Sequence, residues 1–253
     1  MNNRTLPVIV FAGPTVDATD FPEDLQAHLC GPASQGDMVR AVQQNGPCVI
    51  ALIDGLFQGV PAVRHKEILW AMAQGAIVFG AASMGALRAA ELWRCGMHGR
   101  GLIYRWLRRF PLLPDDAVAV LHAPPELGAG SLTEALVDLR QAIKHARRRG
   151  RVTAEAAQTL LQKAHALHYT ERTVTNIAEG LPQQERADVI ASMLRSHSSQ
   201  KKRDAMNLLK ELRQRQLVKN WPAASSGAEF VYTDAFLHDL AESGFPTDTL
   251  DVH

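Results

Sequence analysis

A continuous apolar run, CVIALI at residues 48–53, constrains the fold of this chain more than any other feature. The run ends directly in Asp54–Gly55, a dipeptide that is typical of turns. A strand with apolar side chains in consecutive positions is buried on both faces, as happens in parallel sheets that helices cover on each side. The run therefore predicts a strand of such a sheet.

Two more apolar runs match this interpretation. Residues 7–12 (PVIVFA) are closed by a Gly-Pro turn, and residues 76–80 (AIVFG) follow a helical stretch that begins at Pro61 and stops before Gly75. Residues 26–30 are a weaker candidate strand. Strands that alternate with helices indicate βαβ units, so we expect an α/β fold with a mostly parallel sheet and flanking helices.

Helical patterns dominate the second half of the chain. Ser131-x-x-Glu134 is a capping-box pattern at the start of an amphipathic stretch, and one more strand is predicted over residues 118–121. We expect an α/β core with the active site over residues 1–125 and a helical region over residues 126–253 that packs on the core and binds partners. The helices of this second region are predicted over residues 131–147, 153–168, 170–178, 183–195, 200–219 and 233–243.

Composition excludes several classes of protein. Apolar residues make up 46% of the 253 residues and charged residues 21%, which indicates a globular chain rather than a disordered one. No apolar run approaches the ~20 residues of a membrane helix, and the N-terminus does not look like a signal peptide, so we expect a cytoplasmic location. Three cysteines without CxxC spacing and ten histidines without HxH or HExxH spacing indicate neither a metal site nor a bound cofactor.

Charge is unevenly distributed along the chain. Residues 88–151 contain 12 Lys/Arg against 6 Asp/Glu, whereas residues 221–253 contain six acidic residues and no Lys or Arg. Such an asymmetry could steer a charged partner, or it could be a solvated surface of mixed sign. The basic runs lack interleaved aromatic residues, so no nucleic-acid partner is indicated.

Polar turns follow several of the predicted strands and should meet at one edge of the sheet. The segment GAASMG at residues 80–85 lies between a strand and a helix and resembles a nucleophile elbow, although Ala81 replaces the first glycine of the G-x-S-x-G pattern. In this interpretation Ser83 is a nucleophile and the Met84 N–H is an oxyanion donor at the start of a helix. The alternative is that Ser83 is only a helix N-cap.

Lys66 is the second candidate catalytic residue. On a helical wheel Lys66 falls inside the apolar arc of its helix, whereas Arg64 and Glu67 fall on the polar side. We therefore expect Lys66 to be buried, with a lowered pKa that suits a general base for a serine, and Arg64 and Glu67 to be more exposed. The alternatives are an ion pair with Asp54 or Asp37, or a side chain that extends to solvent.

Four further residues are candidates for supporting roles. Asp54, at a strand end, could orient Lys66 or His65, and Thr15, in the turn after the first strand, could line the oxyanion site. His65 also falls inside the apolar arc, where a hydrogen-bonded core histidine is the alternative to a catalytic one. His122, at the end of the predicted strand 118–121, could be either a site residue or a structural one.

The chain resembles the TfuA-like family. The resemblance rests on residues 53–97, which contain HKEILWA and GAASMGALRAAE, and is supported by VIVFAGPT, PASQGDMVRA, DDAVAVLHAP and SLTEALVDLR. It covers residues 7–145 well. The resemblance implies a partner of a YcaO-type, ATP-using enzyme that introduces thioamides into peptide backbones. It further implies hydrolysis of the C-terminal thiocarboxylate of a ThiS-like, ubiquitin-fold sulfur carrier by a Ser–Lys pair, which here is Ser83 and Lys66.

Three functions remain open at this point. The first is the Ser–Lys thiocarboxylate hydrolase of sulfur transfer, and the second is a non-catalytic adaptor that recruits the YcaO-type enzyme and the precursor peptide. The third is a small-molecule-binding α/β protein without hydrolytic activity. A Lys66 ammonium group within hydrogen-bond reach of Ser83 would favour the first, and a Lys66 held elsewhere would favour the second.

Overall fold

The computed structural model describes residues 6–56, 60–111, 114–121, 123, 131–195, 199–224, 230–246 and 250. The chain forms two compact units, one made of Met1–Pro111 with Asp204–His253 and the other of Leu112–Arg203. These bounds differ from the expected boundary at residue 125, because the last fifty residues return to the first unit.

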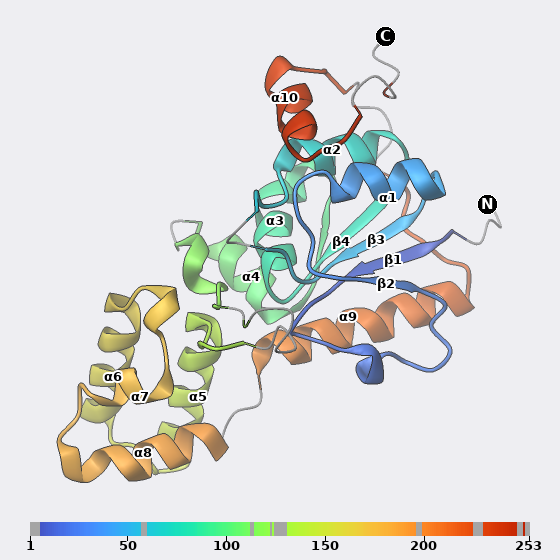
Figure 1. Cartoon of the computed structure of the whole chain (residues 1–253). Helices are drawn as coiled ribbons and strands as arrows, with labels where there is room; N and C mark the ends of the chain where they lie inside the picture. The colour runs from blue at the N-terminus through green and yellow to red at the C-terminus, as the bar shows by residue number, and fades with distance from the viewer. Residues whose placement is uncertain are drawn as a thin grey trace. The chain divides into compact units, whose positions relative to one another are not determined.

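The first unit is built on a parallel sheet of five strands (Figure 1): β1 (Val8–Phe11), β2 (His28–Cys30), β3 (Val49–Leu52), β4 (Ile77–Gly80) and β5 (His98–Gly99). Their order is β2-β1-β3-β4-β5. The predicted α/β class and parallel sheet are confirmed, and the weak candidate at residues 26–30 is β2. The two-residue β5 was not predicted.

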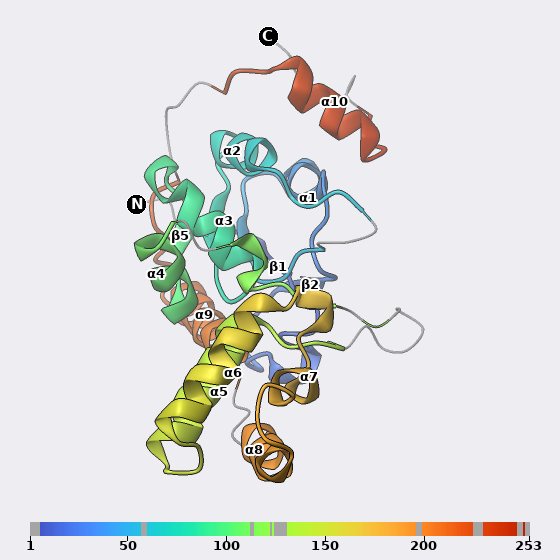
Figure 2. The same ribbon diagram turned by 90° about the vertical axis from the view of Figure 1, so that its left-hand side faces the viewer.

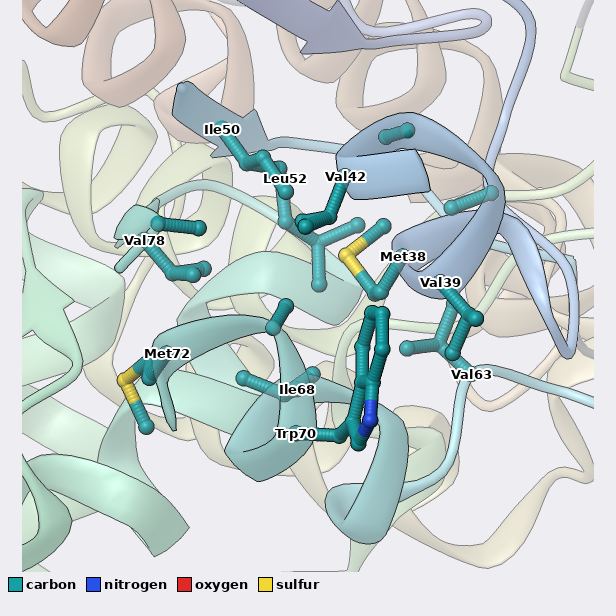
Figure 3. Packing of buried hydrophobic residues seen from close by; sticks show 14 of the residues in the cluster. Met38, Val39, Val42, Ile50, Leu52, Val63, Ile68, Trp70, Met72 and Val78 are labelled. Atoms are coloured by element: carbon teal, nitrogen blue, oxygen red, sulfur yellow. The ribbon is translucent and has the colours of Figure 1, made fainter. Parts of the chain in front are cut away.

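One face of the sheet is covered by α1 (Asp37–Asn45) and α2 (His65–Ala73), which lie side by side in Figure 1. Both connect strands that advance in the same direction across the sheet, and right-handed crossovers place such helices on the same face. Figure 3 shows the resulting core, in which Met38 of α1 and Ile68 and Trp70 of α2 pack near Leu52. The C-terminal α10 (Asp234–Glu242) adds Phe236 and Leu240 to this core.

The opposite face is covered by a helix from the far end of the chain. The β1–β2 connection crosses this face but holds only the short η1 (Ala18–Asp20). The missing helix is supplied by α9 (Gln200–Leu217), on the other side of the sheet from α1 and α2 in Figure 1. Its buried apolar side chains pack in one cluster with those of the sheet: Ala205, Leu208, Leu209 and Leu212 with Val8, Val10, Val49, Ala51, Ile77 and Phe79.

Beyond β4 the chain forms α3 (Met84–Leu92), η2 (Trp93–Cys95) and then, after β5, α4 (Gly101–Arg109). Helices α3 and α4 pack on each other, and Figure 2 shows both near β5. The sequence pattern gave no prediction for α4.

The second unit is helical, as predicted: η3 (Asp115–Ala117), α5 (Leu136–Arg148), α6 (Ala154–Ala166), η5 (Tyr169–Glu171), α7 (Val174–Ala178) and α8 (Gln183–Arg195). Buried Arg172 connects η3 with the end of α6, because its guanidinium group donates to the Asp116 carboxylate at 2.8 Å and to the backbone carbonyls of Asp116, Ala164 and Leu167. No helix of the described residues in either unit is long and apolar enough to span a membrane.

Two predictions for the second unit are wrong. Residues 118–121 form no strand, although Val118 is fully buried, because their backbone groups bond within a local turn and to side chains. Ala119 N–H donates to the Asp116 carbonyl, Leu121 N–H donates to Thr133 Oγ1, and Lys201 Nζ donates to the Val118 carbonyl. The capping box at Ser131 does not start a helix. The Ser131 hydroxyl donates to the Thr133 carbonyl instead, and α5 begins at Leu136.

Candidate functional site

The carboxyl edge of the sheet holds four of the predicted site residues of the first unit, Thr15, Asp54, Ser83 and Met84. Strands β1 and β3 are neighbours, but the connection after β1 packs in the α9 cluster and the connection after β3 packs in the α1–α2 cluster. Ligands of open α/β sheets bind at such a switch point. Backbone hydrogen bonds connect the ends of β1 and β3 at this point, because the amides of Ile53 and Asp54 both donate to the Phe11 carbonyl.

Asp54 and Thr15 meet at this switch point. The Asp54 carboxylate is buried and accepts hydrogen bonds from Gly13 N–H at 2.8 Å, Thr15 N–H at 3.1 Å and Thr15 Oγ1 at 2.6 Å. Its oxygens thus fix the loop after β1 against the end of β3. Asp54 therefore does not orient Lys66 or His65, as we had expected it could, and Thr15 Oγ1 is engaged by this carboxylate.

Ser83 lies in a strained turn between β4 and α3. Ala82 has a φ of +67°, and Ser83 N–H donates to the Ala81 carbonyl at 2.9 Å, which is the hydrogen bond of a γ-turn. A non-glycine residue at positive φ costs of order 1–3 kcal/mol and is concentrated at functional sites. Ser83 is buried and holds the N-cap position, yet its side chain makes no capping hydrogen bond to α3. This geometry favours a role other than a cap.

Close packing fixes this turn against the neighbouring strand. A Cβ atom at Gly85 would overlap the Leu52 carbonyl oxygen, and one at Gly80 would overlap the Gly85 carbonyl oxygen. Glycine at both positions therefore lets the start of α3 touch the backbone of β3 and β4. This is the physical logic of a nucleophile elbow, with the strain at Ala82 rather than at the serine.

The first turn of α3 leaves one amide beside Ser83 available. Gly85 N–H donates to the Ile53 carbonyl, and the amides of Ala86 and Leu87 donate to the Ser83 carbonyl. Within the described part of the chain, Met84 N–H has no acceptor, and the Met84 side chain is buried. The predicted oxyanion donor is thus an unengaged N–H at a helix N-terminus.

Lys66 does not have the environment that the helical wheel predicted. Its side chain is only half-buried, its ammonium group donates to the Val231 carbonyl at 3.1 Å, and its Nζ lies 5.1 Å from the centre of the Phe230 ring. Among the described residues no hydrogen bond joins Lys66 to Ser83. The expected burial is wrong because the helix turns this side chain toward the C-terminal segment rather than toward the sheet.

Glu67 is the group that the chain buries instead. We expected it to be exposed, but it is 1% exposed, whereas Arg64 is exposed as expected. The Glu67 carboxylate accepts from Gly36 N–H at 2.9 Å, Met38 N–H at 3.2 Å and Arg64 N–H at 2.7 Å, so it caps α1 and α2 together. Burial raises the pKa of Glu67 to about 8, against the lowering effect of these three N–H donors.

His65 and His122 complete the predicted set. His65 is exposed rather than in the core, and its Nε2 lies 2.7 Å from Glu91 Oε2 on α3. His122 lies outside the described residues. Within those residues, no group of three or more His, Cys, Asp and Glu side chains is arranged to hold a metal ion.

Comparison with known families identifies part of the chain. Residues 54–173 match the family described as TfuA-like protein. This segment belongs to the TfuA-like family. No curated protein matches the chain.

The TfuA-like segment begins at the end of β3 and includes α2, the Ser83 turn and α3, together with most of the helical unit. It therefore contains Asp54, Lys66, Ser83 and Met84. Thr15 and strands β1–β3 precede it, and α9 and α10 follow it.

Proposed function

We propose that this TfuA-like protein hydrolyses the C-terminal thiocarboxylate of a ubiquitin-fold sulfur carrier of the ThiS type. The sulfide would be supplied to a YcaO-type enzyme that introduces thioamides into a peptide. The family membership is consistent with a role in thioamidation. The observation that carries the hydrolytic part is the Ser83 turn: a buried serine on a strained strand-to-helix turn, next to an unengaged amide at a helix start.

The chemistry uses atoms that this turn presents. Ser83 Oγ attacks the thiocarboxylate carbon, and Met84 N–H donates to the oxygen on which negative charge develops. The C–S bond then breaks, the serine proton leaves with the sulfur as HS⁻, and an acyl ester remains on Ser83. Water hydrolyses this ester and returns a carrier with an ordinary C-terminal carboxylate.

Lys66 is the proposed general base, and its contacts set a condition on that role. A general base for Ser83 must be a neutral amine within hydrogen-bond reach of Ser83 Oγ, whereas the Lys66 ammonium group is held at the Val231 carbonyl. The segment that holds it is also fixed by a hydrogen bond of 3.1 Å between Trp70 Nε1 and Tyr232 Oη. Lys66 would therefore act only after residues 230–232 shift, for example when a partner binds.

Sulfide release tests the proposal. Purified wild-type protein and the variants Ser83→Ala and Lys66→Ala are mixed with a ThiS-like carrier that bears a C-terminal thiocarboxylate, and free sulfide is measured over time. Ser83→Ala should abolish release, and Lys66→Ala should reduce it nearly as much because the two groups act as a unit. Ser131→Ala, a serine of the second unit, is the matched control and should release sulfide at the wild-type rate.

A non-catalytic adaptor is the second candidate, and the anchoring of Lys66 on Val231 favours it. An adaptor would bind the YcaO-type enzyme and the precursor peptide and would raise thioamide formation with free sulfide supplied. Sulfide release by Ser83→Ala at the wild-type rate would refute Ser83 as the nucleophile and make the adaptor the favoured candidate. Loss of release with retained enzyme binding would support the hydrolase.

A further inference from the structure

An exposed tryptophan at the end of α3 is stacked with arginine. Trp93 is 38% exposed, although tryptophan is among the residues that a monomer buries most. The Arg108 guanidinium carbon lies 3.9 Å from the centre of the Trp93 ring, and that of Arg94 lies 5.2 Å away. The ring and the two guanidinium groups hold one another in place while remaining accessible to solvent.

A second pair of the same kind continues this surface along α4. The Arg109 guanidinium carbon lies 5.8 Å from the centre of the Phe110 ring, and Phe110 is 49% exposed. We call Trp93, Arg94, Arg108, Arg109 and Phe110 the arginine–aromatic surface. The expectation that the basic stretch lacks interleaved aromatic residues is therefore wrong: YRWLRRF at residues 104–110 already interleaves them in the sequence, and the fold adds the contact of Arg108 with Trp93.

The positive charge of this surface is not neutralised within the chain. Two nearby arginines are paired: Arg88 with Glu91 at 2.8 Å, and Arg100 with Glu211 at 2.6 Å. In contrast, none of the arginines of the arginine–aromatic surface has a carboxylate partner in the part of the chain that the structure describes. The surface is complementary to an acidic partner.

The side chains indicate a protein rather than a single-stranded nucleic acid. Tryptophan and arginine carry much of the binding energy of protein interfaces, and stacked guanidinium groups lose less freedom when they bind carboxylates in a bidentate manner. A nucleobase needs an open aromatic face on which to stack. Arg108 already covers a face of the Trp93 ring.

The surface lies within reach of Ser83 along a single helix. Ser83 immediately precedes α3 and Trp93 immediately follows it. The nine residues of α3 span roughly 14 Å at 1.5 Å per residue, a distance that an extended chain covers in about four residues. A partner bound at Trp93 could therefore lay a short C-terminal tail along α3 to the Ser83 turn.

We propose that the arginine–aromatic surface docks the acidic face of the sulfur carrier while the carrier's tail reaches Ser83. This inference rests on the proposed function, because it takes the substrate to be a protein with an extended tail. The body of the carrier would contact Trp93, Arg94 and Arg108. Ser83 would contact only the last residues of the tail.

Binding is measured without turnover, in protein that carries Ser83→Ala. A fluorescently labelled ThiS-like carrier is titrated and its anisotropy recorded at two salt concentrations. Adding Arg94→Glu and Arg108→Glu should weaken the carrier's affinity at least about tenfold and reduce its salt dependence. The milder pair Arg94→Gln and Arg108→Gln should weaken it in the same direction, which guards against a folding defect. Unfolding midpoints of all variants are compared.

The matched control reverses two charges elsewhere. Arg147→Glu and Arg148→Glu, on exposed positions of α5, change the net charge equally and should leave affinity within about threefold. Equal weakening by both double variants would show that net charge alone steers the carrier, and would overturn the inference. So would an unchanged affinity of the Arg94/Arg108 variants, or tighter binding of a 20-nucleotide single strand than of the carrier.

This outcome is separable from that of the proposed function. Loss of carrier binding in the Arg94/Arg108 variants supports the docking surface even if Ser83→Ala still releases sulfide, in which case only the nucleophile is wrong. Normal binding by these variants together with loss of sulfide release in Ser83→Ala would refute the surface and keep the hydrolase.

Discussion

Glu67 should make the protein less stable as the pH rises. Its carboxyl group is buried, and burial raises its pKa to about 8 in the folded protein, from an ordinary value of 4.5. Between these two values the folded state binds more protons than the unfolded state, so the free energy of unfolding falls with pH by up to about 1.4 kcal/mol per pH unit. From pH 5 to pH 8 the loss from this group is of order 3–4 kcal/mol.

Glu67→Gln removes the titration and keeps a neutral side chain of the same shape. The amide NH2 replaces one of the two oxygens that accept from backbone N–H groups, so we expect the variant to be about 1–3 kcal/mol less stable than wild type at pH 5, where Glu67 is protonated in the folded protein. By pH 8 it should gain about 3–4 kcal/mol relative to wild type. Urea unfolding of both proteins at four pH values measures this difference. Subtracting the variant from wild type cancels every other titrating group.

Glu91→Gln is the control, because the contribution of Glu91 to stability should change with pH in the opposite direction. Burial of Glu91 acts to raise its pKa, but hydrogen bonds from His65 and Arg88 outweigh this and lower it, so its contribution is lost as the pH falls. A wild-type protein that gains stability over Glu67→Gln as the pH rises would refute the reasoning. It would mean that the three backbone N–H donors outweigh burial and keep the carboxylate ionised.

Two substitutions test the carboxyl edge of the sheet. Gly85→Ala should destabilise the protein by at least about 2–3 kcal/mol because its Cβ would overlap the Leu52 carbonyl. Gly31→Ala is the control, since it has open space around it and should change stability by less than about 1 kcal/mol. Equal shifts of the thermal unfolding midpoint in the two variants would contradict this. Asp54→Ala should lower the free energy of unfolding in urea by about 3 kcal/mol because it leaves the donors of Gly13 and Thr15 without an acceptor. Asp54→Asn should lower it less. An Asp54→Ala variant as stable as wild type would show that water replaces the carboxylate.

The three strands β1, β3 and β4 were predictable because they are buried on both faces. Residues 48–53 are apolar at every position, and a short run of this kind is typical of a strand that is covered on both faces. Residues 118–121 show the limit of the same argument. They are also apolar, and Val118, Ala119 and Val120 are buried, but the Leu121 N–H bonds to the Thr133 side chain and the Val118 carbonyl to the Lys201 side chain, which no local pattern reveals.

The candidate site was predictable in its backbone and not in its electrostatics. The small residues around Ser83 indicated a tight turn, and the strain at Ala82 and the contact of Gly85 with β3 agree with it. The helical wheel predicted a buried Lys66 and an exposed Glu67, which is the reverse of what the structure shows. The reason is that a wheel assumes that one face of α2 meets only the sheet. Glu67 instead meets the amides at the start of α1, and Lys66 meets Val231, more than 160 residues away along the chain.

Helix α9 is synthesised long after the strands that it covers, so one face of the sheet lacks its helix during synthesis. Strands β1, β3 and β4 are complete by residue 80, but the helix that covers their second apolar face joins the first unit only from Asp204. At about 5–20 residues per second, synthesis of the intervening stretch takes of order 6–25 s. During that time Val8, Val49 and Ile77 have no helix to bury them. We therefore expect the nascent chain to bind chaperones that hold apolar strands, and its expression to depend on them more than that of a sheet whose covering helices follow its strands directly.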